Sequence, residues 1–178
     1  MSYEVLESKE LFHGKVMNVE VDTVVMPDGK TATRETVVRG NASAIVPIDK
    51  DGNIIFVRQY RHPLKKLVLE IPAGMIDENE DPFICAAREL EEETGYRSDN
   101  ITLLAEMHSA IGFCTEKLFI YTAKDLKAGK QHFDEDEFIE LEKYSLEEAI
   151  QMIFDGRITD SKTMVGILGY KELLLKEK

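Results

Sequence analysis

Residues 86–96 read AARELEEETGY and concentrate four glutamates within five consecutive positions, beside a single arginine, Arg88. These glutamates are Glu89, Glu91, Glu92 and Glu93. Like charges three or four positions apart on a helix repel each other by a few tenths of a kcal/mol per pair. Carboxylate oxygens are the ligands that hard cations such as Mg²⁺ or Mn²⁺ prefer, so a bound metal would relieve this repulsion. The stretch is therefore either a metal site or a solvated acidic surface.

The flanking residues predict that this stretch belongs to a helix over 81–94. Asp81 suits the N-cap, Pro82 suits the first turn, and Gly95 favours a stop. At about 100° per residue, an apolar side faces the core and Glu91 lies nearer its edge. The apolar side carries Phe83, Ala86, Ala87, Leu90 and Thr94. The opposite side carries Glu89, Glu92 and Glu93. The helix thus combines a core face with a concentrated carboxylate face.

The rest of the chain shows strand and helix patterns that predict an α+β fold. Longer strands are expected over 16–26, 31–38, 42–48, 54–60, 67–71 and 118–123, with short ones near 103–104 and 138–141. One further helix begins at Ser145, where Glu148 completes a capping-box pattern, and another runs from about 160 to 175. The first forty residues resemble an antiparallel meander. We therefore expect a small N-terminal antiparallel sheet at 1–40 and a main domain at 41–178.

The composition narrows the class of protein. The 178 residues are 43% hydrophobic and 31% charged, enough for the core of one domain with a small appendage. A net charge of -12 argues against a nucleic-acid backbone binder. A bound cation would still admit a small anionic substrate. Two cysteines fit a reducing compartment, and the N-terminus has no apolar signal core. No apolar run reaches the ~18 residues of a membrane span, so we expect a soluble, cytoplasmic protein without membrane association.

Residues 74–96, GMIDENEDPFICAARELEEETGY, resemble the Nudix box, the signature of the Nudix hydrolases. The spacing from Gly74 to Glu80 and on to the run from Arg88 to Gly95 matches, while Tyr96 stands where the family usually has an aliphatic residue. The resemblance implies an α/β/α sandwich. It also implies attack of water on a diphosphate joined to another group, with Mg²⁺ or Mn²⁺ as the cofactor.

The resemblance implies roles for the residues on and beside the acidic helix. Arg88 would orient the glutamates by ion pairing and take part in catalysis, and Glu80 would support the preceding loop. Glu92 is also a candidate catalytic carboxylate. The implied metal ligands are the carbonyl of Ala73 and the carboxylates of Glu89, Glu92 and Glu93. Such a metal polarises phosphoryl oxygens and lowers the pKa of bound water, whose proton a nearby carboxylate can take.

Further motifs are similar to the Nudix subgroup that hydrolyses ADP-ribose and other nucleoside diphosphate sugars. They are RQYR at 58–61, EIPAG at 70–74, SAIGFCTEKLFIYTAKDL at 109–126 and ITDSKTMVGIL at 158–168. Ile111 stands where ADP-ribose hydrolases commonly have proline, just before the glycine that matches Gly112. This departure leaves the nucleobase and the sugar open.

The subgroup resemblance implies a set of substrate-binding residues. They are Arg58, Arg61, Glu70, Gly112 and Glu116. Arginine offers bidentate donors that suit phosphate, although an arginine at a strand end is also a common surface residue. Glu116 either reaches the substrate or is a solvated start of a strand.

The run HFDEDEFIEL at 132–141 is a second acidic segment. In the subgroup, a glutamate of the corresponding loop acts as the general base. Glu135 matches best when counted back from the strand near Ile139, and Glu137 is second. A solvated charged loop is the alternative interpretation.

The subgroup's N-terminal sheet exchanges across a homodimer and helps to bind the base, so the implied partners are a nucleoside diphosphate sugar and a second copy of the chain. Two alternative functions stay open. One is a catalytically silent Nudix-fold regulator, against which the intact glutamates argue. The other is a Nudix hydrolase of a dinucleoside polyphosphate, a nucleoside triphosphate or coenzyme A, against which the N-terminal meander and RQYR argue.

Overall fold

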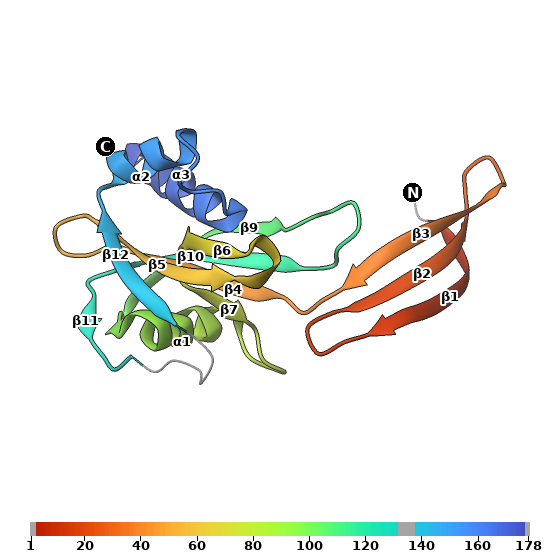
Figure 1. The fold of residues 1–178 in the computed structure, drawn as a ribbon, viewed down its shortest axis with the longest axis horizontal. Helices are drawn as coiled ribbons and strands as arrows, with labels where there is room; N and C mark the ends of the chain where they lie inside the picture. Colours follow the sequence, from red (N-terminus) through yellow and green to blue (C-terminus); the bar gives the residue numbers. More distant parts are fainter. Residues whose placement is uncertain (1–2, 132–137, 177–178) are drawn as a thin grey trace. The chain divides into compact units, whose positions relative to one another are not determined.

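The computed structural model describes residues 3–131 and 138–176. The chain divides into two compact units (Figure 1). The first unit comprises residues 1–41 and 108–117, and the second comprises residues 42–107 and 118–178. The acidic helix and the motifs at 58–61 and 70–74 all belong to the second unit.

The first unit is built on an antiparallel meander, as the sequence predicts. Its strands, in the order β1-β2-β3, are β1 (Glu4–His13), β2 (Asn18–Val25) and β3 (Thr31–Val38). The turn between β2 and β3 places Gly29 at a φ of 80°, which costs glycine little. The segment at 108–117 joins this unit because the Val37 amide donates to the Phe113 carbonyl over 2.7 Å and the Thr115 amide donates to the Val37 carbonyl over 3.0 Å.

Two larger sheets form the middle of the second unit. The four-stranded sheet, in spatial order, contains β7 (Ala73–Met75), β4 (Ala42–Pro47), β10 (Lys117–Lys124) and β9 (Asn100–His108). The three-stranded sheet contains β12 (Ile139–Tyr144), β5 (Ile54–Arg61) and β6 (Lys66–Glu70). Strands β4 and β10 run parallel, while β5 pairs antiparallel with both of its neighbours. A small ladder joins β8 (Tyr96–Arg97) to β11 (Lys127–Ala128).

Helices cover both faces of the second unit's sheets, as Figure 1 shows. Helix α1 (Pro82–Thr94) lies on one side, and α2 (Leu146–Phe154) and α3 (Ser161–Lys176) lie on the other. A short 3-10 helix, η1 (His62–Leu64), follows β5. The predicted α/β/α sandwich is therefore confirmed. No helix in residues 3–131 and 138–176 is long and apolar enough to cross a membrane.

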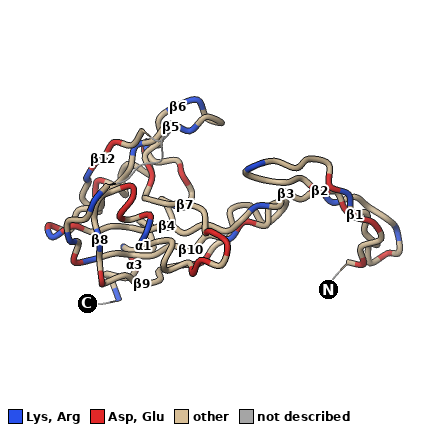
Figure 2. Tube along the Cα trace, turned by 90° about the horizontal axis from the view of Figure 1, so that it is seen from below, with Lys and Arg blue, Asp and Glu red and all other residues tan. Residues whose placement is uncertain are grey.

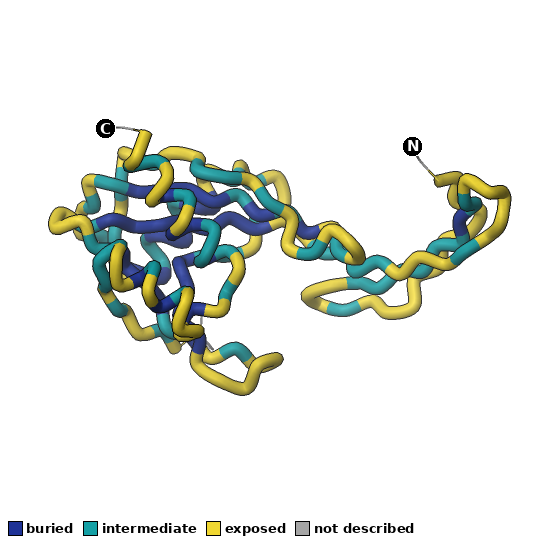
Figure 3. Tube along the Cα trace, turned by 90° about the horizontal axis from the view of Figure 1, so that it is seen from above, coloured by how far each residue is buried: buried dark blue, intermediate teal, exposed yellow. Residues whose placement is uncertain are grey.

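Strand β4 explains how two helix layers share one sheet. Its side chains alternate between the two faces, so Ala44 and Val46 join the core beneath α2 and α3, whereas Ile45 packs with Ala86 and Leu90 of α1. All six residues of β4 are buried, and Figure 3 shows the buried positions along the strands of this unit. The acidic helix is thus fixed to the centre of the sheet by its apolar side.

Local signals set the ends of the helices where the sequence predicts them. The Asp81 carboxylate accepts a hydrogen bond from the Phe83 amide over 2.8 Å, and Gly95 closes α1 with a φ of 71°. Ser145 and Glu148 form both halves of the capping box of α2.

Two details differ from the sequence-based expectation. No strand is expected between 71 and 103, but Ala73–Met75 forms the edge strand β7, because β4 offers it an antiparallel partner. Phe83 was expected in the core, yet it is 42% exposed at the first turn of α1, where its ring meets the edge of Tyr121.

Candidate active site

Arg88 lies at the centre of the charged face of α1, whose acidic positions are drawn red in Figure 2. Its guanidinium donates to both carboxylate oxygens of Glu80, over 2.9 and 3.0 Å. It also donates to Glu89 over 2.6 Å and to Glu92 over 2.9 Å. A further bond reaches the Met75 carbonyl over 3.1 Å. One arginine therefore joins the loop before the helix, the edge strand β7 and two glutamates of α1.

The backbone of β7 seats the two buried glutamates of α1. Glu89 and Glu93 are only 8% and 3% exposed, whereas the side chain of Glu92 is 40% exposed. The Ala73 amide donates to the Glu93 carboxylate over 3.2 Å. A β-carbon added at Gly74 would collide with the carboxylate of Glu89. The absence of a side chain at Gly74 thus leaves the room that Glu89 occupies, and the bland interpretation of a solvated acidic surface is wrong for Glu89 and Glu93.

The charges around Arg88 shift the titration of its neighbours. Hydrogen bonding to Arg88 lowers the pKa of Glu80 to about 2, so this carboxylate stays ionised. The pKa of Arg88 is raised, first by its bond to Glu80 and further by the charge of Glu89. Burial raises the pKa of Cys85 to about 12, and its thiol contacts the Met75 carbonyl at 3.5 Å. Cys85 is therefore a protonated, buried residue and not a nucleophile.

The donors on α1 fit a hard divalent cation. The three carboxylates of Glu80, Glu89 and Glu92 surround the guanidinium of Arg88, which leaves this group of side chains negative. Glu93 adds a further buried carboxylate on the same helix. Within the described ranges, no three acidic, histidine or cysteine side chains converge closely enough to form a complete metal cage. Mg²⁺ rarely needs one, because it keeps several waters and takes one or two carboxylates together with substrate phosphates. Glu89 and Glu93, seated by β7, supply such a pair.

A second charged cluster surrounds Glu70, which is 3% exposed at the end of β6. Arg61 donates to both oxygens of its carboxylate, over 2.7 and 2.8 Å, and Lys162 of α3 forms a further ion pair with it. Lys162 also lies 3.0 Å from Asp160. Burial alone would raise the pKa of Glu70, but the two cations hold it below its ordinary value. The bond to Glu70 is likewise the main cause of the raised pKa of Arg61.

Lys162 and Asp160 were not among the residues indicated by the sequence. They lie within the ITDSKTMVGIL motif, whose resemblance to the subgroup assigns no role to either residue. The sequence signal that points to them is the position of Asp160 and Lys162 at the expected start of a helix. The acid with which Lys162 pairs, Glu70, ends the expected strand at 67–71.

Arg58, a predicted phosphate ligand, is held by β12. Its guanidinium pairs with Glu142, donating over 3.1 Å from one terminal nitrogen, and the Tyr144 hydroxyl contacts the same carboxylate. The bond to Glu142 raises the pKa of Arg58. Phosphate binding by Arg58 stays a prediction, and it would have to use the donors that Glu142 leaves free.

The two remaining substrate candidates, Gly112 and Glu116, belong to the first unit. An added β-carbon at Gly112 would meet nothing within 4 Å. Glu116 is 8% exposed and lies 3.1 Å from the Arg39 guanidinium. Glu116 is thus a buried, paired residue, and its interpretation as a solvated strand start is wrong.

The predicted general bases, Glu135 and Glu137, lie outside the described residues. The described segment before them is fixed to the end of α1. The Gly129 amide donates to the Gly95 carbonyl over 2.7 Å, and the Gln131 side chain donates to the Glu93 carbonyl over 2.7 Å.

This fold and this arrangement of glutamates match a known family. The model of the NUDIX domain matches residues 38–164, and that of the nucleoside diphosphate sugar hydrolase N-terminal domain matches residues 3–37. The chain belongs to the NUDIX domain family. The Nudix resemblance of residues 74–96 is thereby confirmed.

Individual relatives cover nearly the whole chain. It is 41% identical over 164 residues to the methanol dehydrogenase activator of Bacillus methanolicus, covering 91% of this chain and 89% of the relative. It is 36% identical over 177 residues to an ADP-ribose pyrophosphatase of Bacillus subtilis, covering 97% and 96%. The crystal structure of an ADP compounds hydrolase superposes with a TM-score of 0.91 at 23% identity, covering 99% and 96%, and supports the fold alone.

Proposed function

We propose that this chain is a metal-dependent Nudix hydrolase that cleaves the diphosphate bond of a nucleoside diphosphate sugar such as ADP-ribose. The products are a nucleoside monophosphate and a sugar phosphate. One observation carries the proposal: Glu89 and Glu93 are buried carboxylates, seated side by side on α1 by the backbone of Ala73 and Gly74. The relative in Bacillus subtilis and the N-terminal domain model support the substrate class.

The chain's own residues divide the work as follows. Glu89 and Glu93 hold Mg²⁺ or Mn²⁺, joined by the Ala73 carbonyl and by Glu92. When bound, the metal polarises the phosphoryl oxygens and lowers the pKa of a bound water. Arg88 keeps the glutamates oriented through the bonds described above. Water adds to one phosphorus, the bridging P–O bond breaks, and a carboxylate takes the proton of the water.

The phosphates of the substrate require cationic donors as well as metal. Arg61 is the better placed of the two predicted arginines because of its position relative to α1, while both arginines retain N–H groups beyond the two that bind their glutamate partners. The charge of Glu93 is one cause of the raised pKa of Arg61, so this arginine lies near the acidic face of α1. We place the diphosphate between Arg61 and that face.

For the general base we propose Glu135, with Glu137 as the alternative in the same acidic run. Glu135→Gln should lower kcat by about 10²- to 10⁴-fold with little change in KM, because the base acts in the transition state. The matched variant Glu137→Gln should keep most activity. The reverse result would move the base by two residues, and loss in neither would leave Glu92 as the candidate.

A homodimer completes the proposal, with the first unit as its interface. Every residue of β1 is exposed, and several large apolar side chains of the meander are about half exposed or more: Val5, Leu6, Leu11 and Phe12. Large apolar side chains exposed in this way favour contact with another protein surface. Light scattering at micromolar concentration should give twice the chain mass, and a monomer mass would reject the dimer.

A substrate panel tests the proposed function. The panel holds ADP-ribose, ADP-glucose, GDP-mannose, UDP-glucose, NADH and diadenosine polyphosphates, each with Mg²⁺, and phosphorus NMR identifies the products. We expect a nucleoside monophosphate and a sugar phosphate from at least one sugar nucleotide. Release of nucleotide products from the diadenosine polyphosphates alone would favour a Nudix hydrolase of dinucleoside polyphosphates.

The alternative function is a regulator without hydrolytic activity. The relative in Bacillus methanolicus is called an activator of a dehydrogenase, which is the observation that favours this alternative. A silent regulator has no need of buried carboxylates such as Glu89 and Glu93. Absence of product from every member of the panel, with the folded protein confirmed by circular dichroism, would favour the regulator.

A further inference from the structure

The first turn of α3 is tied by hydrogen bonds to the end of β6. The hydroxyl of Thr163, which is fully buried, accepts a bond from the Ile71 amide over 2.9 Å. The same hydroxyl donates to the Asp160 carboxylate over 2.6 Å, and the Thr163 amide donates to that carboxylate over 3.0 Å. Because the hydroxyl is both donor and acceptor, its orientation is fixed and the Ile71 amide is satisfied.

Lys162 adds a second tie to the neighbouring residue. Its ammonium pairs with the Glu70 carboxylate and lies 3.0 Å from Asp160, and its side chain is mostly buried. Glu70 and Ile71 are consecutive. Lys162 therefore fixes the side chain of Glu70, and the next residue of α3, Thr163, fixes the backbone of Ile71.

Packing leaves α3 little freedom to slide along the sheet. One turn beyond Thr163, a β-carbon added at Gly166 would lie 2.9 Å from a Val46 methyl and 3.0 Å from the Ile71 side chain. Real β-carbons do not approach so closely, so the helix backbone lies almost directly on these residues. The start of α3 thus has one position relative to Ile71.

The segment after Ile71 is the one that seats the active-site glutamates. Pro72 follows, with a φ fixed by its ring, and its carbonyl accepts a bond from the Ile45 amide over 2.9 Å. The next two residues contact Glu93 and Glu89, as described above. A displacement of Ile71 must therefore reach Ala73 and Gly74, since only Pro72, whose φ is fixed by its ring, lies between Ile71 and Ala73.

We propose that Lys162 and Thr163 are positioning residues of the active site. They fix the backbone of residues 70–74 against α3, and this backbone in turn places Glu89 and Glu93 for the metal. The proposal rests on the proposed function for its effect on hydrolysis. Its effect on backbone order and on metal affinity does not need a substrate.

The first test compares Thr163→Val with Thr163→Ser. Valine keeps the shape and loses the hydroxyl, whereas serine keeps the hydroxyl. In the valine variant we expect faster hydrogen exchange at the Ala73 amide, measured by NMR without metal, and about tenfold weaker Mn²⁺ binding, measured by electron paramagnetic resonance. Loss of an outer partner of a metal ligand has effects of this size. The serine variant should keep both values close to those of the parent.

The second test compares Lys162→Met with Lys171→Met, a lysine on the exposed side of the same helix. For Lys162→Met we expect about tenfold weaker Mn²⁺ binding and a lower kcat with KM nearly unchanged. Lys171→Met should match the parent in all three values. A rise in KM at constant kcat and constant Mn²⁺ affinity would mean that Lys162 binds the substrate directly, and would overturn its positioning role.

The outcomes separate this proposal from the proposed function. If the parent hydrolyses nothing in the panel but Thr163→Val still weakens Mn²⁺ binding, the function is wrong and the positioning role stands. If Thr163→Val lowers only the melting temperature, with Mn²⁺ affinity and Ala73 exchange unchanged, or if serine fails to restore them, the positioning role is wrong. Should Thr163→Val not fold, the Lys162 pair decides.

Discussion

Two clusters of carboxylates and basic side chains in the described residues, one around Arg88 and one around Glu70, differ in charge balance. Around Arg88, the three carboxylates of Glu80, Glu89 and Glu92 face one cation. Around Glu70, two carboxylates, its own and that of Asp160, face the two cations Arg61 and Lys162. The charges of the second cluster are balanced within the chain, so it stabilises the fold without a bound ion. The first keeps an excess of negative charge, which favours the binding of a further cation.

Replacing one carboxylate in each cluster should separate these roles, and the largest effect is expected for Glu93→Gln. The change keeps the size of the side chain and removes a metal ligand, so turnover should fall by about 100-fold or more, equivalent to about 2.7 kcal/mol of barrier. Thermal stability without metal should hardly change, because repulsion on α1 is relieved.

The control for Glu93→Gln lies on the same helix. Glu91 pairs with Arg97 over 2.5 Å, away from Arg88. Glu91→Gln should keep turnover within about threefold of the parent, a difference below 1 kcal/mol. Equal losses in both variants would show that α1 responds to charge in general and that Glu93 is not a specific ligand.

The corresponding change in the balanced cluster, Glu70→Gln, should act on stability. It leaves Arg61 and Lys162 facing each other around a neutral group. Breaking a fully buried ion pair costs about 3–5 kcal/mol, and the partial exposure of Arg61 reduces this to roughly 2 kcal/mol. The melting temperature in EDTA should fall by about 4–8 °C. A melting temperature equal to that of the parent would contradict the structural role of this cluster.

A smaller effect is expected when the seat of Glu89 is filled. In Gly74→Ala the new methyl group takes the room of the carboxylate, which must move. Mn²⁺ affinity should weaken about tenfold, or about 1.4 kcal/mol. Calorimetric titration measures this, with Gly112→Ala as the control because a β-carbon there meets nothing within 4 Å. Unchanged affinity in Gly74→Ala would show that Glu89 does not need its present position.

The smallest effect concerns acid stability through Glu80. Its pKa is lowered in the folded chain to about 2 from an ordinary 4.5. Its contribution is therefore complete above pH 4.5 and is lost as the pH falls toward 2. In EDTA, Glu80→Gln should melt about 2–4 °C below the parent at pH 6, a difference of about 1 kcal/mol, and the gap should close on acidification.

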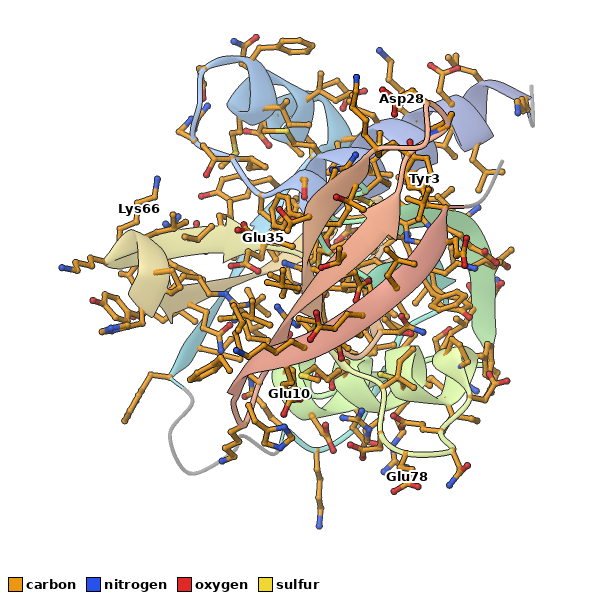
Figure 4. The ribbon with its side chains drawn as sticks, turned by 90° about the vertical axis from the view of Figure 1, so that its right-hand side faces the viewer. Tyr3, Glu10, Asp28, Glu35, Lys66 and Glu78 are labelled. Atoms are coloured by element: carbon orange, nitrogen blue, oxygen red, sulfur yellow. The ribbon has the colours of Figure 1, made fainter. Side chains whose placement is uncertain are left out.

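The control for Glu80→Gln is Glu78→Gln on the same loop, whose exposed side chain is labelled in Figure 4. The melting temperature of Glu78→Gln in EDTA should match that of the parent at every pH. A gap between Glu80→Gln and the parent that stays constant down to pH 2 would contradict the ion pair with Arg88 as its cause.

The sequence predicts the Arg88 cluster far better than the Glu70 cluster, and the reason is distance along the chain. Asp81, Gly95 and the glutamates between them lie within one helix and its caps, so local rules place them. Glu70 and Lys162 are 92 residues apart, and Arg58 and Glu142 are 84 apart. Such pairs depend on how β6 meets α3 and how β5 pairs with β12. No local pattern contains that information.

Local rules also failed where a partner element changed the outcome. The strand β7 exists because β4 pairs with it, and a proline-glycine stretch alone predicts a turn. On a helical wheel, Glu89 and Glu93 lie on the same side of α1 as the exposed Glu92. In the folded chain β7 covers Glu89 and Glu93. Burial of these two glutamates was therefore visible only in the folded chain.

We propose that the carboxylates of Glu89 and Glu93 on α1 hold a divalent cation. The test is a Mn²⁺ titration followed by electron paramagnetic resonance. It compares the metal-free parent with a variant that carries both Glu89→Gln and Glu93→Gln. We expect saturable Mn²⁺ binding to the parent and binding at least tenfold weaker in the double variant, whose circular dichroism matches the parent. Equal binding by both proteins, or none by the parent, would contradict the claim.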